Sequence, residues 1–159
     1  MTLALGIDPG TATTGYGLVR FSTDGALEYV ACGVFVTPPH TPAPDRLLLL
    51  HQDLTQLIAQ YHPDTYAVEK LFFQRNVSTA MAVGQARGVV LLAIAQAGGE
   101  ALEYTPNEVK QAVAGYGSAE KRQVQEMVRT LLGLPDIPRP DDAADALAIA
   151  ITHLHTQRY

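Results

Sequence analysis

The residues Leu3-Ala4-Leu5-Gly6-Ile7-Asp8-Pro9-Gly10 form a short apolar run that ends in an acid and a Pro-Gly pair. A run of this length, bounded by turn residues, is typical of a buried strand. Residues 16–21 and 27–36 are also β-rich, and the Asp24-Gly25 pair between them favours a tight hairpin turn. The first three strands are therefore predicted to form an antiparallel meander.

After the proline-rich segment 38–44, the pattern alternates between helix and strand. Leucines at helical spacing predict a helix that ends before Pro63. Thr105-Pro106-Asn107-Glu108 is a capping box that starts another helix. The expected elements are helix 45–60, strand 64–71, helix 76–97, strand 100–104, helix 106–114, a helix capped by Ser118 that ends at Leu132, and helix 141–155.

Consecutive strand–helix–strand units require parallel crossovers. The chain is thus predicted to be an α/β protein with a five-stranded mixed sheet, its first three strands antiparallel, flanked by helices. This order of elements resembles the ribonuclease H-like fold. The 159 residues suit one domain, residues 1–159, and a hydrophobic content of 47% is enough for a core.

The composition indicates the expected compartment, and the net charge argues against binding to nucleic acid. The longest apolar run, 88–95, is shorter than the ~20 residues that span a bilayer, and no basic leader precedes the first strand. The single cysteine, Cys32, cannot form an internal disulfide, which fits a reducing compartment. We therefore expect a cytoplasmic protein without a membrane partner. The net charge of −5 is unusual for a protein that binds nucleic acid.

Two acids end predicted strands. Asp8 precedes a turn, where a strand can project a side chain into a cleft, although an Asp before Pro-Gly also serves simply to start a turn. Glu69 ends a strand expected to be buried on both faces, where an ionised carboxylate is costly without a positive partner. Lys70 points to the opposite face of such a strand, so a metal-ligand role is favoured for Glu69.

Further acids open the last predicted helix. Asp142 and Asp145 are three positions apart and share a helix face, with alanines between them that permit close approach to a sheet. Acids in a first helical turn also interact favourably with the helix dipole, so Asp141 and Asp142 can be caps. Spacing alone equally allows Asp141 to pair with Asp145.

Hard carboxylate oxygens select Mg²⁺ or Mn²⁺ rather than zinc or iron. Two such ions activate a water at a phosphodiester and stabilise the leaving 3′ oxygen. The five histidines lack the spacing of a zinc protease. His153 and His155 are expected in a solvated polar tail, with one histidine beside the metals left open. The sequence therefore favours metal-dependent phosphodiester hydrolysis.

Five motifs, in order along the chain, resemble the RuvC family of Holliday junction resolvases: Gly6-Ile7-Asp8-Pro9-Gly10, Val68-Glu69, Gly84-Gln85-Ala86-Arg87-Gly88, Gly117-Ser118-Ala119-Glu120-Lys121 and Asp142-Ala143-Ala144-Asp145-Ala146-Leu147. The resemblance implies an endodeoxyribonuclease of DNA recombination and repair that uses Mg²⁺, two ions per active site, with Mn²⁺ as a substitute. It implies a homodimer that nicks a four-way junction symmetrically, and partnership with the RuvA–RuvB branch-migration complex.

The resemblance also implies roles for residues. The family's catalytic and metal-binding carboxylates match Asp8, Glu69, Asp142 and Asp145, which decides for Asp142 over Asp141. Its basic residues near the scissile phosphate match Lys110 and Lys121, although solvated surface lysines are the commoner explanation for such a pair. Its junction-stacking aromatic matches Phe72, whereas Phe73 is assigned to the core. Arg75 and Arg87 are expected to add phosphate contacts.

A homodimer suits two symmetric cuts, because a two-fold axis relates two active sites. The small residues Ala80, Gly84 and Gly88 recur every four positions in the predicted helix 76–97 and indicate close packing. Contact with the sheet of the same subunit is the simplest explanation. Which helix face forms the dimer stays open.

Two alternatives to the nuclease stay open. Gly6-Ile7-Asp8-Pro9-Gly10-Thr11, followed by Thr14-Gly15-Tyr16-Gly17, also resembles the first phosphate loop of actin-like ATPases and sugar kinases. Those proteins enclose ATP between two such domains, and this chain has no second phosphate loop. The other alternative is a non-catalytic module that binds junctions, against which the presence of all four carboxylates argues.

Overall fold

The computed structural model describes residues 1–10, 12–70 and 77–157, apart from the side chain of Ser78. The strands are β1 (Thr2–Asp8), β2 (Thr13–Phe21), β3 (Leu27–Val36), β4 (Thr65–Glu69) and β5 (Ala101–Tyr104). The helices are α1 (Ala43–Tyr61), α2 (Val77–Gln96), α3 (Pro106–Ala114), α4 (Lys121–Leu132) and α5 (Asp141–Gln157). Each predicted element is present, with its boundaries within three residues of those expected.

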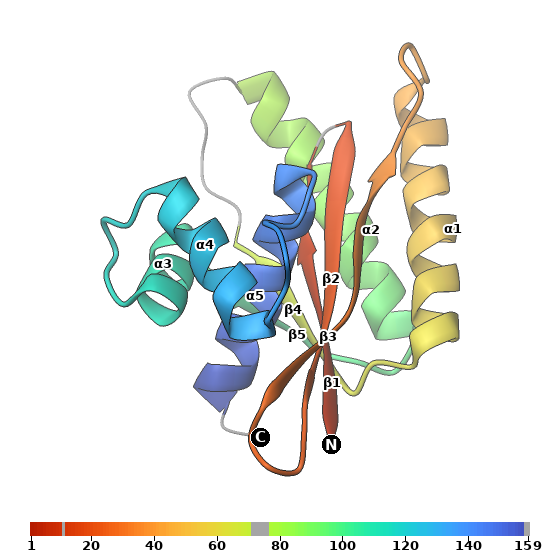
Figure 1. The fold of residues 1–159 in the computed structure, drawn as a ribbon. Helices are drawn as coiled ribbons and strands as arrows, with labels where there is room; N and C mark the ends of the chain where they lie inside the picture. The colour runs from red at the N-terminus through yellow and green to blue at the C-terminus, as the bar shows by residue number, and fades with distance from the viewer. Residues whose placement is uncertain (11, 71–76, 158–159) are drawn as a thin grey trace.

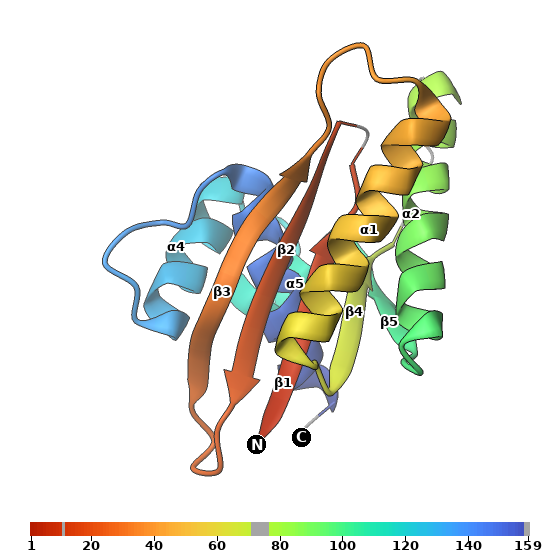
Figure 2. The ribbon, with the colours of Figure 1, turned by 90° about the vertical axis from the view of Figure 1, so that its right-hand side faces the viewer.

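The strand order in the sheet is β3-β2-β1-β4-β5. β2 pairs antiparallel with β1 and β3, whereas β4 pairs parallel with β1 and β5. The predicted five-stranded mixed sheet with an antiparallel meander is confirmed, and Figure 2 shows it behind α1 and α2. β2 begins three residues earlier than expected, at Thr13, because Gly15 pairs with Asp8 at the end of the ladder.

Helices cover both faces of the sheet, with α1 and α2 on one side and α3, α4 and α5 on the other (Figure 1). Alternate residues of each strand supply the two cores. Leu5 and Ile7 of β1 pack with α1 and α2, whereas Ala4 packs beneath α5. The period of two therefore directs Gly6 and Asp8 toward α5.

Helix α5 crosses β1 and β2 at glycines. A Cβ atom on Gly15 would collide with the backbone carbonyl of Asp142, and one on Gly17 would lie 2.6 Å from the backbone nitrogen of Leu147. Gly6, the register partner of Gly17, meets α5 in the same way. Side chains at these positions would push the helix off the sheet, so the three glycines set the height at which α5 lies.

The helix starts show one confirmed prediction and one wrong one. The capping box at Thr105 is present, because Glu108 N–H donates to the Thr105 hydroxyl and Thr105 N–H donates to the Glu108 carboxylate. Ser118 is not the cap of α4, since a turn occupies residues 116–119. The amide of Glu120 instead donates to the side-chain oxygen of Gln123 at 2.7 Å, and the helix begins one residue later.

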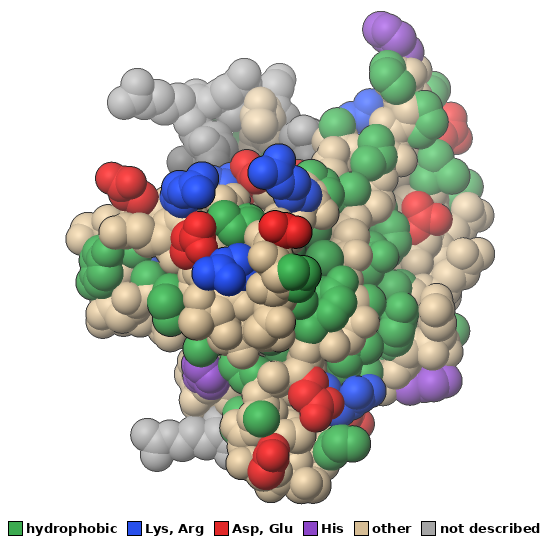
Figure 3. Space-filling view, in the orientation of Figure 1, with side chains coloured by type: hydrophobic (Ala, Val, Ile, Leu, Met, Phe, Trp, Pro, Cys, Tyr) green, Lys and Arg blue, Asp and Glu red, His purple; other side chains and the backbone are tan. Residues whose placement is uncertain are grey.

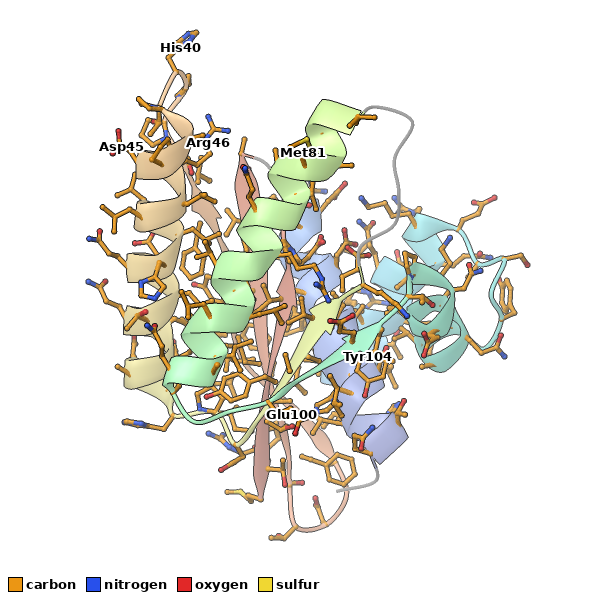
Figure 4. All side chains as sticks on the ribbon, turned by 180° about the vertical axis from the view of Figure 1, so that it is seen from behind. His40, Asp45, Arg46, Met81, Glu100 and Tyr104 are labelled. Carbon is orange, nitrogen blue, oxygen red and sulfur yellow. The ribbon has the colours of Figure 1, made fainter. Side chains whose placement is uncertain are left out.

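Helix α2 leaves much of its apolar surface uncovered by the rest of the described chain. Its segment Thr79–Gln96 has the length and apolar composition of a membrane-crossing helix, yet only 22% of it is buried. Val77, Met81 and Leu92 are 70%, 62% and 52% exposed, and Figure 4 shows Met81 near the start of the helix. The expected contact with the sheet is wrong at Gly88, where an added Cβ would meet nothing within 4 Å.

Candidate active site

Carboxylates from distant parts of the chain meet at the carboxyl end of β1. Asp8 is the last residue of β1, and Asp142 and Asp145 lie near the start of α5. One oxygen from each lies within 4.8 Å of the other two. The close approach of α5 explains this, because Gly15 pairs with Asp8 in the sheet and also touches the backbone of Asp142.

Glu69 joins this group from β4. The parallel ladder pairs Val68 with Ile7, so the next residues along, Glu69 and Asp8, lie side by side. Their side chains share a hydrogen bond. Ala67 packs in the core beneath α5, and the period of two puts Glu69 on the same face of the sheet. All four carboxylates singled out in the sequence are thus neighbours.

Burial and crowding raise the pKa values of these acids. Burial, followed by the hydrogen bond and the negative charge of Glu69, holds the pKa of Asp8 well above its usual range. Burial also raises the pKa of Asp145 to about 6, although the ammonium of Lys121 opposes the shift. Acids that repel one another in this way are stabilised by a positive charge placed among them. The oxygen-only donor set therefore fits a divalent metal ion.

Two lysines lie beside the carboxylates. A cavity of about 240 Å³ is lined by Glu69 and Asp145, by Lys110 of α3 and Lys121 of α4, and by apolar residues of α3, α4 and α5. The Nζ of Lys121 is 3.7 Å from Oδ2 of Asp145 and 3.3 Å from Oδ2 of Asp141. Acidic and basic side chains are interspersed over α4 and the start of α5 (Figure 3). The cavity thus presents groups suited to a metal ion next to groups suited to a phosphate.

Comparison with known proteins identifies the family. The model of the family described as crossover junction endodeoxyribonuclease RuvC matches residues 4–153. The chain belongs to the RuvC family. A RuvC from Chloroflexus aurantiacus, named a crossover junction endodeoxyribonuclease, is 62% identical over 153 residues, which cover 96% of this chain and 93% of that relative.

Solved RuvC structures from Thermus thermophilus have the same fold. One superposes with a TM-score of 0.91 at 40% identity, and another, in complex with a Holliday junction substrate, with 0.90 at 37%. Each match covers 99% of this chain and 96% of the Thermus chain. The predicted family, ribonuclease H-like fold and enzyme class, an endodeoxyribonuclease, are confirmed. The match sets aside the comparison with actin-like ATPases and sugar kinases.

The remaining DNA-binding predictions have different outcomes in this RuvC family member. Phe72 and Arg75 lie outside the described residues. Arg87 forms an ion pair with Glu103 of β5. Glu103 is the register partner of Val68, which faces α1 and α2, so Arg87 lies on the face of the sheet opposite the carboxylates. A phosphate contact by Arg87 stays a prediction.

The two histidines near the C-terminus do not share one environment. Helix α5 continues to Gln157, His155 is exposed, and His153 is fully buried, so the expected solvated tail is wrong for His153. Its Nδ1 is 2.8 Å from the Tyr104 hydroxyl and its Nε2 is 2.6 Å from the Thr65 hydroxyl. Both ring nitrogens therefore connect α5 to β4 and β5 rather than to the carboxylates.

Proposed function

We propose that this chain resolves four-way DNA junctions by metal-assisted hydrolysis, with the catalytic carboxylates Asp8, Glu69, Asp142 and Asp145 as metal ligands. The observation that carries this proposal is the convergence of these acids from β1, β4 and α5 beside a cavity that two lysines line. The Thermus RuvC solved with a Holliday junction substrate supports the choice of DNA.

The proposed cofactor is Mg²⁺, with two ions per active site and Mn²⁺ as a substitute. Carboxylate oxygens suit both metals, and four acids supply enough negative charge for two divalent ions. When bound, the ions supply an activated water and neutralise the charge on the leaving 3′ oxygen. The chain contributes a fixed set of ligands. Burial first, and then the neighbouring acids, raise the pKa values of Asp8 and Asp145, and a bound cation would favour their charged forms.

Lys110 and Lys121 are proposed to bind the DNA backbone next to the scissile phosphate. Both line the cavity that Glu69 and Asp145 share, so a phosphate there can contact an ammonium group on one side and the metal site on the other. Because the chain as a whole carries a charge of −5, DNA affinity depends on such placed cations. Phe72 is proposed to stack on a junction base, and Arg75 and Arg87 to contact phosphates.

The uncovered stripe on α2 is the proposed homodimer interface. The stripe consists of residues that recur at helical spacing and are exposed in the single chain: Val77, Met81, Gly88 and Leu92. A partner helix from a second copy would cover this apolar stripe and pack closely at Gly88. Two active sites related by a two-fold axis would then cut two strands symmetrically.

Two further proposals do not depend on the geometry of the site. A partnership with the RuvA–RuvB branch-migration complex rests on the family, and a cytoplasmic location rests on the composition of the sequence. A pull-down with purified RuvA–RuvB on junction DNA would test the partnership.

A cleavage assay tests the proposed function. Wild type and Glu69→Gln are incubated with a synthetic four-way junction or a linear duplex, with Mg²⁺, Mn²⁺ or EDTA. We expect wild type to nick only the junction, symmetrically and only with metal, while Glu69→Gln binds the junction without cutting it. Glu100→Gln, at an exposed acid before β5, is the matched control and should cut normally.

The outcomes separate the alternatives. Cutting by Glu69→Gln at the wild-type rate would refute the assignment of Glu69 as a metal ligand. Junction binding by wild type without cutting under any divalent metal would support a non-catalytic binding module.

A further inference from the structure

Asp141 is an acid beside the metal site that does not belong to it. The oxygens that lie within 4.8 Å of one another come from Asp8, Asp142 and Asp145. Asp141 instead turns toward α4, where its Oδ2 is 3.3 Å from Nζ of Lys121. Its Oδ1 accepts a hydrogen bond of 3.2 Å from the side-chain amide of Gln125, one turn further along the same helix.

Lys121 is therefore shared between two acids with different duties. Asp145, 3.7 Å away, is one of the proposed metal ligands, and Asp141 is not. A divalent cation among the carboxylates repels the Lys121 ammonium and competes with it for the oxygens of Asp145. With a metal ion bound to Asp145, Asp141 would still be available to Lys121.

The lysine needs such a partner. Its side chain is 56% exposed, and a flexible four-carbon stem in solvent samples many rotamers. Asp141 limits this freedom because it opens α5, the helix that also carries Asp142 and Asp145, and because Gln125 holds its second oxygen. The ion pair thus ties the start of α4 to the helix that bears the metal ligands.

We propose that Asp141 is a positioning residue that, braced by Gln125, keeps the Lys121 ammonium at the mouth of the metal cavity, where the DNA phosphate binds. This inference rests on the proposed phosphate-binding role of Lys121. It distinguishes Asp141 from a metal ligand and from a simple helix cap, which are the two other uses of an acid at this position.

A double-mutant cycle tests the inference. Junction cleavage by wild type, Asp141→Asn, Lys121→Ala and the double variant is measured with saturating Mg²⁺. Asp141→Asn should lower kcat about twofold to fivefold, the range of an exposed ion pair, without raising KM. Lys121→Ala should lose more, and the double variant should cut no more slowly than Lys121→Ala. Asp141→Glu should recover activity, and Asp136→Asn, which removes an exposed charge from the α4–α5 connection, should match wild type.

Two measurements without catalysis complete the test. Mn²⁺ binding in the absence of DNA and the thermal midpoint should be unchanged in Asp141→Asn. Weaker Mn²⁺ binding would make Asp141 a ligand, and a lower midpoint with additive losses in the cycle would make it a cap. Either result overturns the inference. Wild-type cutting by Lys121→Ala would instead refute the proposed role of Lys121, on which the inference depends.

Discussion

On the α5 face of the sheet, Gly6, Gly15 and Gly17 let a helix backbone touch the strands. On the other face, large side chains such as Leu5 and Leu18 pack between the sheet and helices α1 and α2. The first face brings Asp8, Asp142 and Asp145 together, with Glu69 beside Asp8. The second leaves an apolar stripe of α2 open. The difference indicates that the chemistry depends on a helix held at a set height, while assembly uses surface that the fold leaves uncovered.

The largest effect on cutting is expected at Asp8, which is a proposed metal ligand and also a buried acid whose charged form is disfavoured in the metal-free protein. Asp8→Asn removes one proposed ligand and one ionisable group from the crowded cluster. Cutting should fall about a thousandfold or more, equal to roughly 4 kcal/mol of barrier, while junction binding persists. The metal-free variant should melt above wild type at pH 7–8. In this range the unfolded chain has lost the Asp8 proton whereas the folded protein, in which the pKa of Asp8 is raised, keeps it, and this difference lowers the stability of wild type. Asparagine does not titrate and removes this cost.

Cleavage rates and melting curves with and without Mg²⁺ check both halves of this prediction. Mg²⁺ should raise the melting temperature of wild type more than that of Asp8→Asn. Asp136→Asn, in the exposed α4–α5 connection, is the control for the loss of one acid. A metal-free Asp8→Asn that melts below wild type would contradict the claim that burial and the neighbouring acids disfavour the charged form of Asp8.

Gly15→Ala tests the close approach of β2 to the backbone of α5. The added methyl group would meet the carbonyl of Asp142, so the helix or the strand must shift. Unfolding in urea should show a loss of about 3 kcal/mol or more, and cutting should fall even where the protein remains folded. A variant with wild-type stability and activity would show that the glycines do not hold the acids together.

His153 tests the other end of the same helix. Burial lowers its pKa to about 4 from an ordinary 6.5, so between these values the unfolded chain binds a proton that the native state does not. The stability due to the neutral imidazole is therefore complete above pH 6.5 and is lost as pH falls toward 4. Between pH 7.5 and 4.5, wild type should lose roughly 2–3 kcal/mol more than His153→Gln does.

Urea unfolding at the two pH values measures this difference. His155→Gln is the matched control, because His155 lies on the same helix but is exposed, and it should follow wild type. Equal pH dependence in wild type and His153→Gln would mean that the buried imidazole titrates normally.

A charged residue placed on the uncovered stripe of α2 tests the proposed dimer interface. Leu92→Glu, on the uncovered stripe of α2, should weaken self-association about thirtyfold, or roughly 2 kcal/mol, while leaving the fold intact. Light scattering and sedimentation over a range of protein concentrations measure the dimer constant. Glu100→Gln should leave that constant unchanged. A monomeric wild type would refute the proposed interface, and binding of wild type to neutral lipid vesicles would assign the stripe to a membrane instead.

Local patterns were sufficient to predict the elements and to single out Asp8, Glu69 and Asp145 as candidate ligands. Strand periodicity, the capping box at Thr105 and the alanines beside Asp142 and Asp145 each express a local preference that the tertiary structure keeps. Choosing Asp142 over Asp141 needed the family resemblance, because helical spacing allows either. Of the described acids at these two positions, Asp142 is the one whose carboxylate lies with those of Asp8 and Asp145, and its role as a metal ligand stays a prediction.

What the sequence did not reveal depends on contacts between distant segments. The burial of His153 comes from β4 and β5, although its spacing of four and eight residues from Ile149 and Asp145 was a usable signal. The ion pair of Asp141 depends on how α4 meets α5, which no local pattern specifies. Gly15 and Gly17, two positions apart in a strand, were the overlooked sign that a helix backbone approaches there.

Gly88→Ala, the counterpart of Gly15→Ala on the open face, should have the smallest effect and the opposite sign. An added Cβ at this helical position meets nothing in the single chain, so alanine should stabilise it by about 0.5–1 kcal/mol through helix propensity alone. This gain is measured by urea unfolding in the Leu92→Glu background. In the otherwise wild-type chain at high concentration, the methyl group would lie between two α2 helices and should weaken the dimer. A gain of equal size in both backgrounds would show that nothing packs on this glycine, and the homodimer would need another face.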